Sequence, residues 1–292
     1  MKRNIVFFVI LICLFWGCDK IEKPYMHLND TKVEPLSVAK FDSIAGTFNA
    51  SGVYRKFLFE EFTGSHCTNC PDGHQTLRDL KTVFGDTMII VGIHAGSLAE
   101  PNYEYPYEFR VSEGLQLYTD FGASYVPFGV LNRTRYNGNS VIIPPTSGKW
   151  KSTIQQRDKS APCAAVQIVN QYDNQRQMLV SNAKVTMLQD YPNPLYIAFY
   201  IIEDKIIKPQ LNHGVRIPDY EHSHVLRGSM NGVYGKPLNG TGILAKDSVC
   251  LMACKISFYE KDWAKENCQI VAFIRDNTTG EILQVEEKDI QN

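Results

Sequence analysis

Two cysteines separated by two residues, Cys67 and Cys70, are the clearest candidates for chemistry in this sequence. Such a pair is typical of three kinds of site: a reactive disulfide, half of a zinc site, or an inert structural bridge. A reactive pair needs its first cysteine at a helix N-terminus, where unpaired backbone N–H groups and the helix dipole stabilise the thiolate. The stretch after the pair, PDGHQTLRDLKTVFG, has apolar residues at helical spacing and ends at Gly85, which predicts such a helix.

The residues around the pair favour the redox interpretation. His66 precedes Cys67 directly, and its protonated ring would stabilise the thiolate further, so we expect Cys67 to be the exposed nucleophile and Cys70 the resolving thiol. A zinc site would need a second pair, and Cys250 and Cys254 lie far away in a β-type run. A structural bridge is the stronger alternative in an exported protein, but so short a loop adds little stability in the loop-entropy picture. We expect no metal and no cofactor.

The N-terminus predicts export. Lys2 and Arg3 precede the apolar run IVFFVILICLFWG, which is shorter than the roughly 20 residues of a membrane-spanning helix and suits a signal peptide. Cys18 follows where the apolar run stops, an arrangement that resembles a bacterial lipobox with a diacylated cysteine. An ordinary signal peptide that contains a cysteine is the alternative. We therefore expect a cell-envelope protein anchored by lipid on Cys18, most readily in the outer membrane.

Length and composition indicate a folded protein of two domains. The chain has 292 residues, of which 44% are hydrophobic, and its net charge is -1. A charge so close to zero gives no reason to expect a nucleic-acid partner. Residues 1–17 are the predicted signal peptide, and the polar residues 18–50 are expected to be a tether that contains one short strand at most.

The segment 51–160 reads as a compact α/β domain. β-favouring runs at 53–62, 87–94 and 126–133 alternate with helical segments at 71–85 and 111–122, and the dipeptide Asn137-Gly138 predicts a hairpin. Thr146 or Ser147 is expected to cap a closing helix.

The segment 161–292 has seven short β-type runs separated by turn residues, which predicts an all-β, immunoglobulin-like sandwich. The run LYIAFYIIED is continuously apolar and is expected to be a central strand. The turn DNTTGE should join the last two runs as a hairpin.

Other candidates have a structural interpretation as the stronger alternative. His222 and His224 would share one face of a strand and form a metal pair, although such histidines are more often structural. In the β-domain, one or two disulfides are expected among Cys163, Cys250, Cys254 and Cys268, and Cys250 should not pair with Cys254. The tyrosines at 103, 105 and 107 suggest either a binding lip or simple loop packing.

Two long segments, KFLFEEFTGSHCTNCPDGHQTLRDL and YTDFGASYVPFGVLNR, resemble the thioredoxin superfamily over about residues 50–160. The form EEFTG before CxxC, with HSHVLR later on, is similar to the outer-membrane lipoprotein family typified by a twenty-eight-kilodalton protein of Gram-negative anaerobes. This second likeness covers most of the mature chain. The combination of CxxC with Val-Pro is specific for the fold and much less specific for activity.

The resemblance implies roles for individual residues. Cys67 and Cys70 correspond to the active-site pair, and Pro127 corresponds to the cis-proline that faces the disulfide. Glu61 corresponds to the buried acidic residue that relays a proton to the inner cysteine, with a partly exposed strand-end residue as the alternative. His66 stands where the superfamily has tryptophan, and this departure leaves substrate and redox direction open.

Two functions remain. The first is a thiol–disulfide oxidoreductase that acts on the thiols or disulfides of other exported proteins. The second is a non-enzymatic outer-membrane or surface lipoprotein that uses both domains as a binding scaffold. Under either function, we expect the segment 95–110 to cover the CxxC pair or to offer a binding surface.

Overall fold

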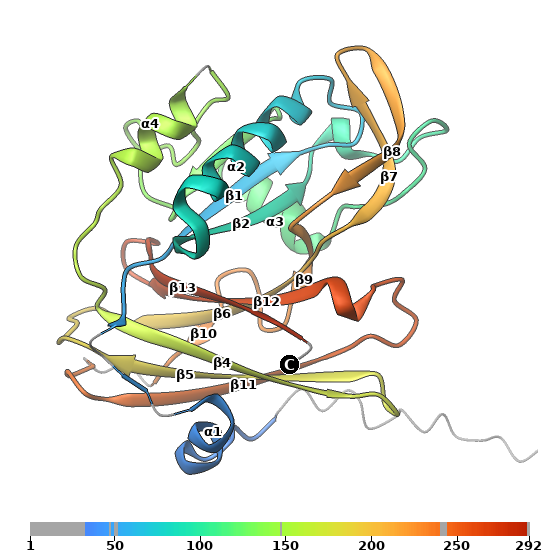
Figure 1. Ribbon diagram of the computed structural model, residues 1–292. Helices are drawn as coiled ribbons and strands as arrows, with labels where there is room; N and C mark the ends of the chain where they lie inside the picture. The colour runs from blue at the N-terminus through green and yellow to red at the C-terminus, as the bar shows by residue number, and fades with distance from the viewer. Residues whose placement is uncertain (1–32, 47, 50–51, 147, 240–243, 291–292) are drawn as a thin grey trace, which may run out of the picture. The chain divides into compact units, whose positions relative to one another are not determined.

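The computed structural model describes residues 33–46, 48–49, 52–146, 148–239 and 244–290 (Figure 1). In chain order its elements are α1 (Val38–Ala45), β1 (Phe57–Thr63), α2 (Cys70–Phe84), η2 (Gly85–Thr87), β2 (Met88–His94), η3 (Ser97–Ala99), α3 (Ser112–Asp120), β3 (Phe128–Leu131), α4 (Lys149–Gln155), β4 (Ala164–Asp173), β5 (Met178–Met187), β6 (Leu195–Glu203), β7 (Ile206–Asn212), β8 (Val215–His222), β9 (Val225–Ser229), β10 (Lys236–Pro237), β11 (Val249–Ser257), η4 (Lys265–Asn267), β12 (Cys268–Asp276) and β13 (Ile282–Asp289).

One large sheet runs through most of the fold. Its strand order is β13-β12-β6-β9-β2-β1-β3, and β10 pairs with the first residues of β6. The pair β1–β2 is parallel, β3 is antiparallel to β1, and β12 is antiparallel to both β6 and β13. A single backbone pairing, Gly92 with Val225, joins β2 to β9 and so makes the sheet continuous. The sequence predicted two separate domains, whereas this sheet crosses the expected boundary at residue 160.

The half of the sheet that carries β1, β2 and β3 has helices on both faces. Leu77 and Leu80 of α2 and Trp150 of α4 pack on one face with Phe59, and Leu117 of α3 packs on the other with Phe62. Strand residues alternate between the two faces of the sheet, so neighbouring apolar residues of β1 pack into two different cores. This explains why β1 begins with three consecutive apolar residues, FLF. All seven residues of β1 are buried.

The other half forms a sandwich. A three-stranded sheet, β11-β5-β4, packs against β6, β12 and β13 through a core that includes Val185, Phe199 and Ile270 (Figure 1). Strand β6 is buried on both faces, because Phe199 points into this core and Tyr200 into the core beneath α3. The prediction that LYIAFYIIED is a central strand is confirmed. So is the hairpin of β12 and β13 around the DNTTGE turn.

A buried ion pair ties the two halves together. Arg133, which follows β3, donates hydrogen bonds to both carboxylate oxygens of Glu60 and to the hydroxyl of Tyr200 in β6. It also donates to the carbonyl of Val233. Removal of either charge would leave the other buried without a partner, which typically costs 3–5 kcal/mol. These contacts hold β1 in place directly ahead of the cysteine pair.

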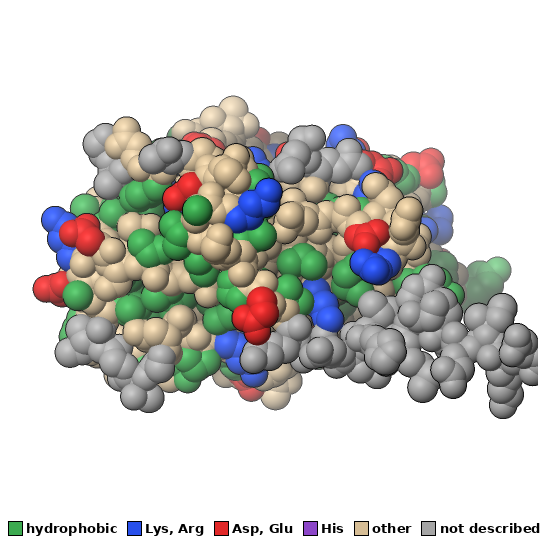
Figure 2. Space-filling model, turned by 90° about the horizontal axis from the view of Figure 1, so that it is seen from below, with side chains coloured by type: hydrophobic (Ala, Val, Ile, Leu, Met, Phe, Trp, Pro, Cys, Tyr) green, Lys and Arg blue, Asp and Glu red, His purple; other side chains and the backbone are tan. Residues whose placement is uncertain are grey.

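Several local expectations need correction. Residues 38–45, expected to be part of a tether, form α1, whose Phe41 is fully buried against the three-stranded sheet. Seen from the side of this helix, the surface has hydrophobic side chains interspersed with charges of both signs (Figure 2). The N-cap of α4 is Gly148, not Thr146, and Ser147 lies outside the described residues. The Asn137-Gly138 hairpin is reduced to isolated bridges.

No helix among the described residues is long and apolar enough to cross a membrane. Cys18 and the predicted signal peptide lie outside these residues.

Candidate functional site

Cys67 and Cys70 form a disulfide at the start of α2, with their Cα atoms 5.4 Å apart. Cys70 is the first residue of the helix, and Cys67 lies in the turn just before it. Pro71 near the first helical position has no N–H that would need a partner, which favours a helix start here. Cys67 is only 2% exposed and Cys70 is fully buried, so the expectation of an exposed nucleophile is wrong for this conformation.

The β7–β8 hairpin covers the cysteine pair. Its backbone donates hydrogen bonds from Leu211 to the carbonyl of Ser65 and from His213 to the carbonyl of Thr68, at 2.8 and 3.0 Å. The buried side chain of Gln210 donates from Nε2 to the carbonyl of Cys67 at 3.1 Å. At the hairpin tip, His213 Nε2 lies 3.0 Å from a carboxylate oxygen of Asp72 in α2. The hairpin therefore covers the turn that contains Cys67 and is hydrogen-bonded to it.

The loop after β2 presses on the same turn from another direction. The backbone N–H of His66 donates to the carbonyl of Leu98 at 3.1 Å. A Cβ atom on Gly64 would lie 2.4 Å from that same carbonyl oxygen, so only glycine fits there. The ring of His66 stacks on Tyr105, and its Nε2 is 2.9 Å from the carbonyl of Glu100. Segment 95–110, which was expected either to cover the cysteine pair or to offer a binding surface, therefore contacts His66, the residue directly before Cys67.

Glu61 lies in β1 directly beneath the first turn of α2. A Cβ atom on Gly73 would sit 2.7 Å from Oε1 of Glu61 and 2.9 Å from the Trp150 ring, so this glycine lets the carboxyl reach the helix. Burial raises the pKa of the Glu61 carboxyl well above its usual value, and the positive charge of Arg78 opposes that rise only in part. Glu61 is therefore a buried carboxylic acid, not the partly exposed residue of the alternative interpretation.

The peptide bond between Val126 and Pro127 is cis, as the resemblance predicted. Pro127 precedes β3 and lines a groove of about 590 Å³ next to the cysteine pair. Asn69, between the two cysteines, lines the same groove. The groove is completed by Asp72, Gly73, Thr76, Val126, Pro145, Thr146, Gly148 and Trp150. The structure thus brings the cis-proline and the cysteine turn together.

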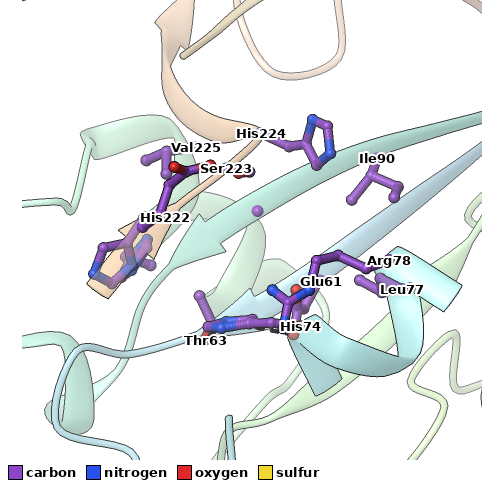
Figure 3. Close-up of a pocket in the computed structure, with 13 residues that line it drawn as sticks. Glu61, Thr63, His74, Leu77, Arg78, Ile90, His222, Ser223, His224 and Val225 are labelled. Carbon is purple, nitrogen blue, oxygen red and sulfur yellow. Dashed lines mark hydrogen bonds and ion pairs between the residues drawn. The ribbon is translucent and has the colours of Figure 1, made fainter. Parts of the chain in front are cut away.

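A second cavity, of about 80 Å³, lies on the other side of Glu61 (Figure 3). Figure 3 shows His74 between Thr63 and Glu61, with His222 and His224 on the segment that faces them. His74 is 3.7 Å from Oε1 of Glu61 and forms a hydrogen bond with the Thr63 hydroxyl at 2.9 Å. Its other nitrogen is 2.7 Å from the hydroxyl of Tyr220.

Three histidines around this cavity are neutral at physiological pH. Burial lowers the pKa of His74 to about 3 and that of His222 to about 4. Burial also holds the pKa of His94 well below its usual value. Like charges add to the effect for His74 and His94, because each histidine would repel the others if protonated.

The histidine pair and the cysteines of the β-domain are arranged differently from what the sequence predicted. His222 ends β8, while His224 has a left-handed backbone with φ 56°, so the two do not share one strand face. No group of three His, Cys, Asp or Glu residues among those described has a geometry suited to a metal ion. The expected bridges of the β-domain are absent from the described residues, because Cys163, Cys250, Cys254 and Cys268 are all free thiols.

The β7–β8 hairpin, with Gln210, His213 and Tyr220, was not predicted from the sequence. The signal that could have found it is His213-Gly214, which lies between two β-type runs and has positive φ at both residues, 46° and 80°. Pro209 and Pro218 made the flanking runs look unlike strands. His74 and His94 were not predicted to be site residues either, because each is the only histidine in its helix or strand.

Comparisons with known proteins support the fold. A family model described as "Outer membrane protein Omp28" matches residues 115–292. The solved structure of HBP35 of Porphyromonas gingivalis is similar, with a TM-score of 0.63 and 15% identity over 82% of this chain and 77% of that one. A domain of the outer membrane lipoprotein Omp28 from Porphyromonas gingivalis is 22% identical over 46% of this chain and 93% of that one, with a TM-score of 0.30. A search of curated proteins gave no match.

Proposed function

The chain belongs to the outer membrane protein Omp28 family, and we propose that it is a thiol–disulfide oxidoreductase that acts on other exported proteins through Cys67 and Cys70. Family membership identifies it as an outer-membrane protein of the cell envelope, as the sequence predicted. In the proposal, lipid on Cys18 anchors the protein, and residues 51–160 are the thioredoxin-like part that carries the activity.

The observation that carries this proposal is the position of the Glu61 carboxyl relative to the disulfide. The carboxyl is buried against the first turn of α2, which begins at Cys70, and one of its oxygens has no hydrogen-bond partner in the described protein. A buried acid without a structural partner costs stability, so a purely structural disulfide gives no reason for it. A proton donor for a cysteine thiolate needs this arrangement.

The proposed reaction is thiol–disulfide exchange with an exported dithiol. A substrate thiolate attacks Sγ of Cys67, the Cys67–Cys70 bond breaks, and Cys70 leaves as a thiolate that takes a proton from Glu61. The second substrate thiol gives its proton to solvent and attacks the mixed disulfide, which releases Cys67 as a thiolate that takes a proton from solvent. The substrate is oxidised to a disulfide and the enzyme pair is reduced to two thiols. The groove beside Pro127 provides space for an extended substrate segment.

A specific observation favours the second candidate, a non-enzymatic binding scaffold. Cys67 is 2% exposed beneath the β7–β8 hairpin, and a protein substrate cannot reach its sulfur in this conformation. Exchange therefore requires that the hairpin tip move, whereas a scaffold requires no such movement.

Trapping of mixed disulfides in cells tests the proposal. A Cys70→Ala variant keeps Cys67 but cannot release a bound substrate, so discrete disulfide-linked complexes with other envelope proteins are expected. Cys67→Ala is the matched control and should trap nothing, because the substrate becomes attached to Cys67 in the proposed reaction. If Cys70→Ala traps no more than this control, the scaffold function is the correct one.

A further inference from the structure

The cavity of about 80 Å³ beneath α2 connects the Glu61 carboxyl with the protein surface. Its inner wall includes Glu61, Thr63 and His94, which are buried, and its outer rim includes Arg78 and Glu221, which are exposed. The cavity is therefore a short passage with the buried acid at one end and solvent at the other. It does not overlap the residues that line the groove beside Pro127.

The walls of this passage carry polar atoms that lack protein partners. Oε1 of Glu61, both ring nitrogens of His94 and Nδ1 of His222 are buried and form no hydrogen bond with other described groups. A neutral imidazole has one donor and one acceptor, and buried polar groups nearly always find partners in protein or in ordered water. All these atoms belong to residues that line this cavity. Water molecules that hydrogen-bond to several of these atoms are the simplest explanation for such a cluster.

The size of the cavity fits that account. A buried water needs roughly 10–15 Å³ of accessible space and two to four polar partners. A volume of about 80 Å³ accommodates several waters in a row. An apolar cavity of this size would stay dry, but the residues that carry the four unpaired polar atoms line this one.

We propose that this cavity is a water-filled channel through which the Glu61 carboxyl exchanges its proton with solvent, with His94 and His222 holding the water chain and His74 forming part of its wall. The histidines are positioning residues, because they touch neither the cysteines nor a substrate in the described contacts. His74 links the inner end to Thr63 and Tyr220 by hydrogen bonds of 2.9 and 2.7 Å.

The channel supplies a step that the proposed function needs, and in that respect it rests on that function. When Glu61 has given its proton to the Cys70 thiolate, the buried carboxylate must regain a proton before the next turnover. A carboxylate in a dry core would do so only when the protein opens locally. Water along the neutral imidazoles delivers that proton from solvent without exposing the disulfide.

The groups that face Glu61 across the channel come from several elements. His74 and Arg78 belong to α2, His94 belongs to β2, and Glu221 and His222 belong to β8. Arg78 is the charged group with a direct effect on the carboxyl, and its positive charge favours the ionised form. Arg78 is an exposed residue at the rim of the cavity.

Infrared spectroscopy of the full-length protein tests the channel without any enzymatic assay. The C=O band of the protonated Glu61 carboxyl is identified by its loss in Glu61→Gln, and its shift is followed after transfer to D₂O. In the wild type we expect deuteration to be complete much sooner than that of core amides. In a His94→Leu/His222→Leu variant the walls become apolar, and we expect deuteration to slow about tenfold or more, because exchange then needs local opening.

A control and a milder variant accompany this experiment. His213→Leu removes an exposed histidine that does not line the channel, and it should leave the exchange rate unchanged. Gly92→Ala adds one methyl group to the channel wall at 3.4 Å from the nearest backbone atom, an ordinary contact, and should slow exchange while all polar groups stay in place. Unchanged deuteration in folded His94→Leu/His222→Leu and in Gly92→Ala would overturn the proposal.

Reduction kinetics give a second, separable test. Glu61→Gln should slow reduction of the disulfide by dithiothreitol by on the order of 10²-fold, the usual contribution of a positioned acid. In repeated cycles of reduction and reoxidation, where Glu61 must regain its proton each time, the His94→Leu/His222→Leu substitutions should slow turnover of the wild type but should cause no further slowing in the Glu61→Gln background. Full additivity would overturn the channel. Failure of the trapping experiment together with slowed deuteration would instead overturn only the oxidoreductase.

Discussion

The side-chain amide of Gln210 donates a hydrogen bond of 3.1 Å to the backbone carbonyl of Cys67. Gln210 is fully buried, and the same amide also donates to the carbonyl of Gly64 at 3.1 Å. A residue that follows Cys67 by 143 positions in the chain therefore fixes the turn that presents it. Access to Cys67 and the stability of this hairpin are linked.

Gln210→Ala should make the disulfide easier to reach. The substitution removes the side-chain donor to two carbonyls, although each keeps a backbone donor, and the loss of these hydrogen bonds costs about 0.5–1.5 kcal/mol and loosens the hairpin. We expect reduction of the Cys67–Cys70 bond by glutathione to become several-fold faster, measured by alkylation of the released thiols. Ile207→Ala, in an exposed part of β7, is the control and should leave the rate unchanged. Equal rates for wild type and Gln210→Ala would mean that the hairpin does not limit access.

Gly73→Ala should destabilise the fold through the site itself. The new methyl group would lie 2.7 Å from Oε1 of Glu61 and 2.9 Å from the Trp150 ring, and overpacking of this kind typically costs 1–3 kcal/mol. A lower midpoint of urea denaturation is the expected result. Gly52→Ala is the control, because a Cβ atom there meets nothing within 4 Å. A midpoint like that of the control would show that Glu61 can leave the helix at little cost.

Acid should destabilise the protein through its buried histidines. The folded-state pKa of His222 is lowered to about 4, so between that value and 6.5 the unfolded chain binds a proton that the folded protein does not. Stability then falls with falling pH by about 1.4 kcal/mol per pH unit for each such histidine. The raised pKa of Glu61 has the opposite sign, since its contribution is lost as pH rises above the unfolded value.

His222→Leu isolates this effect. The dependence of the unfolding free energy on pH, measured by urea denaturation between about pH 4 and 6.5, should become shallower by about 1.4 kcal/mol per pH unit. Val83→Leu, which changes an exposed side chain that does not titrate, provides the comparison and should keep the slope of the wild type. If both variants keep that slope, His222 is protonated in the folded protein.

Much of the site near the cysteines could be predicted from sequence because its parts are local. The strand of β1, the turn with Cys67 and Cys70, and the amphipathic helix α2 follow one another within 28 residues, 57–84. The cis bond before Pro127 came from the resemblance, since local sequence rarely specifies a cis bond. Apolar continuity gave the central position of β6, because a strand buried on both faces has no alternation.

What the sequence did not predict depends on long-range contacts. Nothing in the run that forms β9 specifies that Val225 pairs with Gly92 and joins two expected domains into one sheet. His94 and His222 come together only because β2 and β8 meet over the cavity, where their rings lie 5.5 Å apart. The pairing of Cys163, Cys250, Cys254 and Cys268 could not be judged either, because disulfide formation depends on distances that spacing does not give.

Lipid on Cys18 remains a prediction from the N-terminal sequence. Cys18→Ala should block processing of the signal peptide or release the protein into a soluble fraction, which fractionation and immunoblotting would detect. A Cys250→Ala variant, which removes a cysteine of the folded part, should stay with the membrane. Normal processing and membrane retention of Cys18→Ala would place the anchor elsewhere.

The reduction potential of the Cys67–Cys70 pair tests the proposed chemistry most directly. Backbone N–H groups at the start of α2 favour the thiolate, and burial keeps the nearby Glu61 neutral, so the reduced form is stabilised. The protein would be equilibrated with glutathione buffers and the thiols at these two positions quantified by peptide mapping. A catalytic pair should have a potential above the ~-270 mV of thioredoxin. A potential below about -300 mV, which is typical of structural disulfides, would contradict the account.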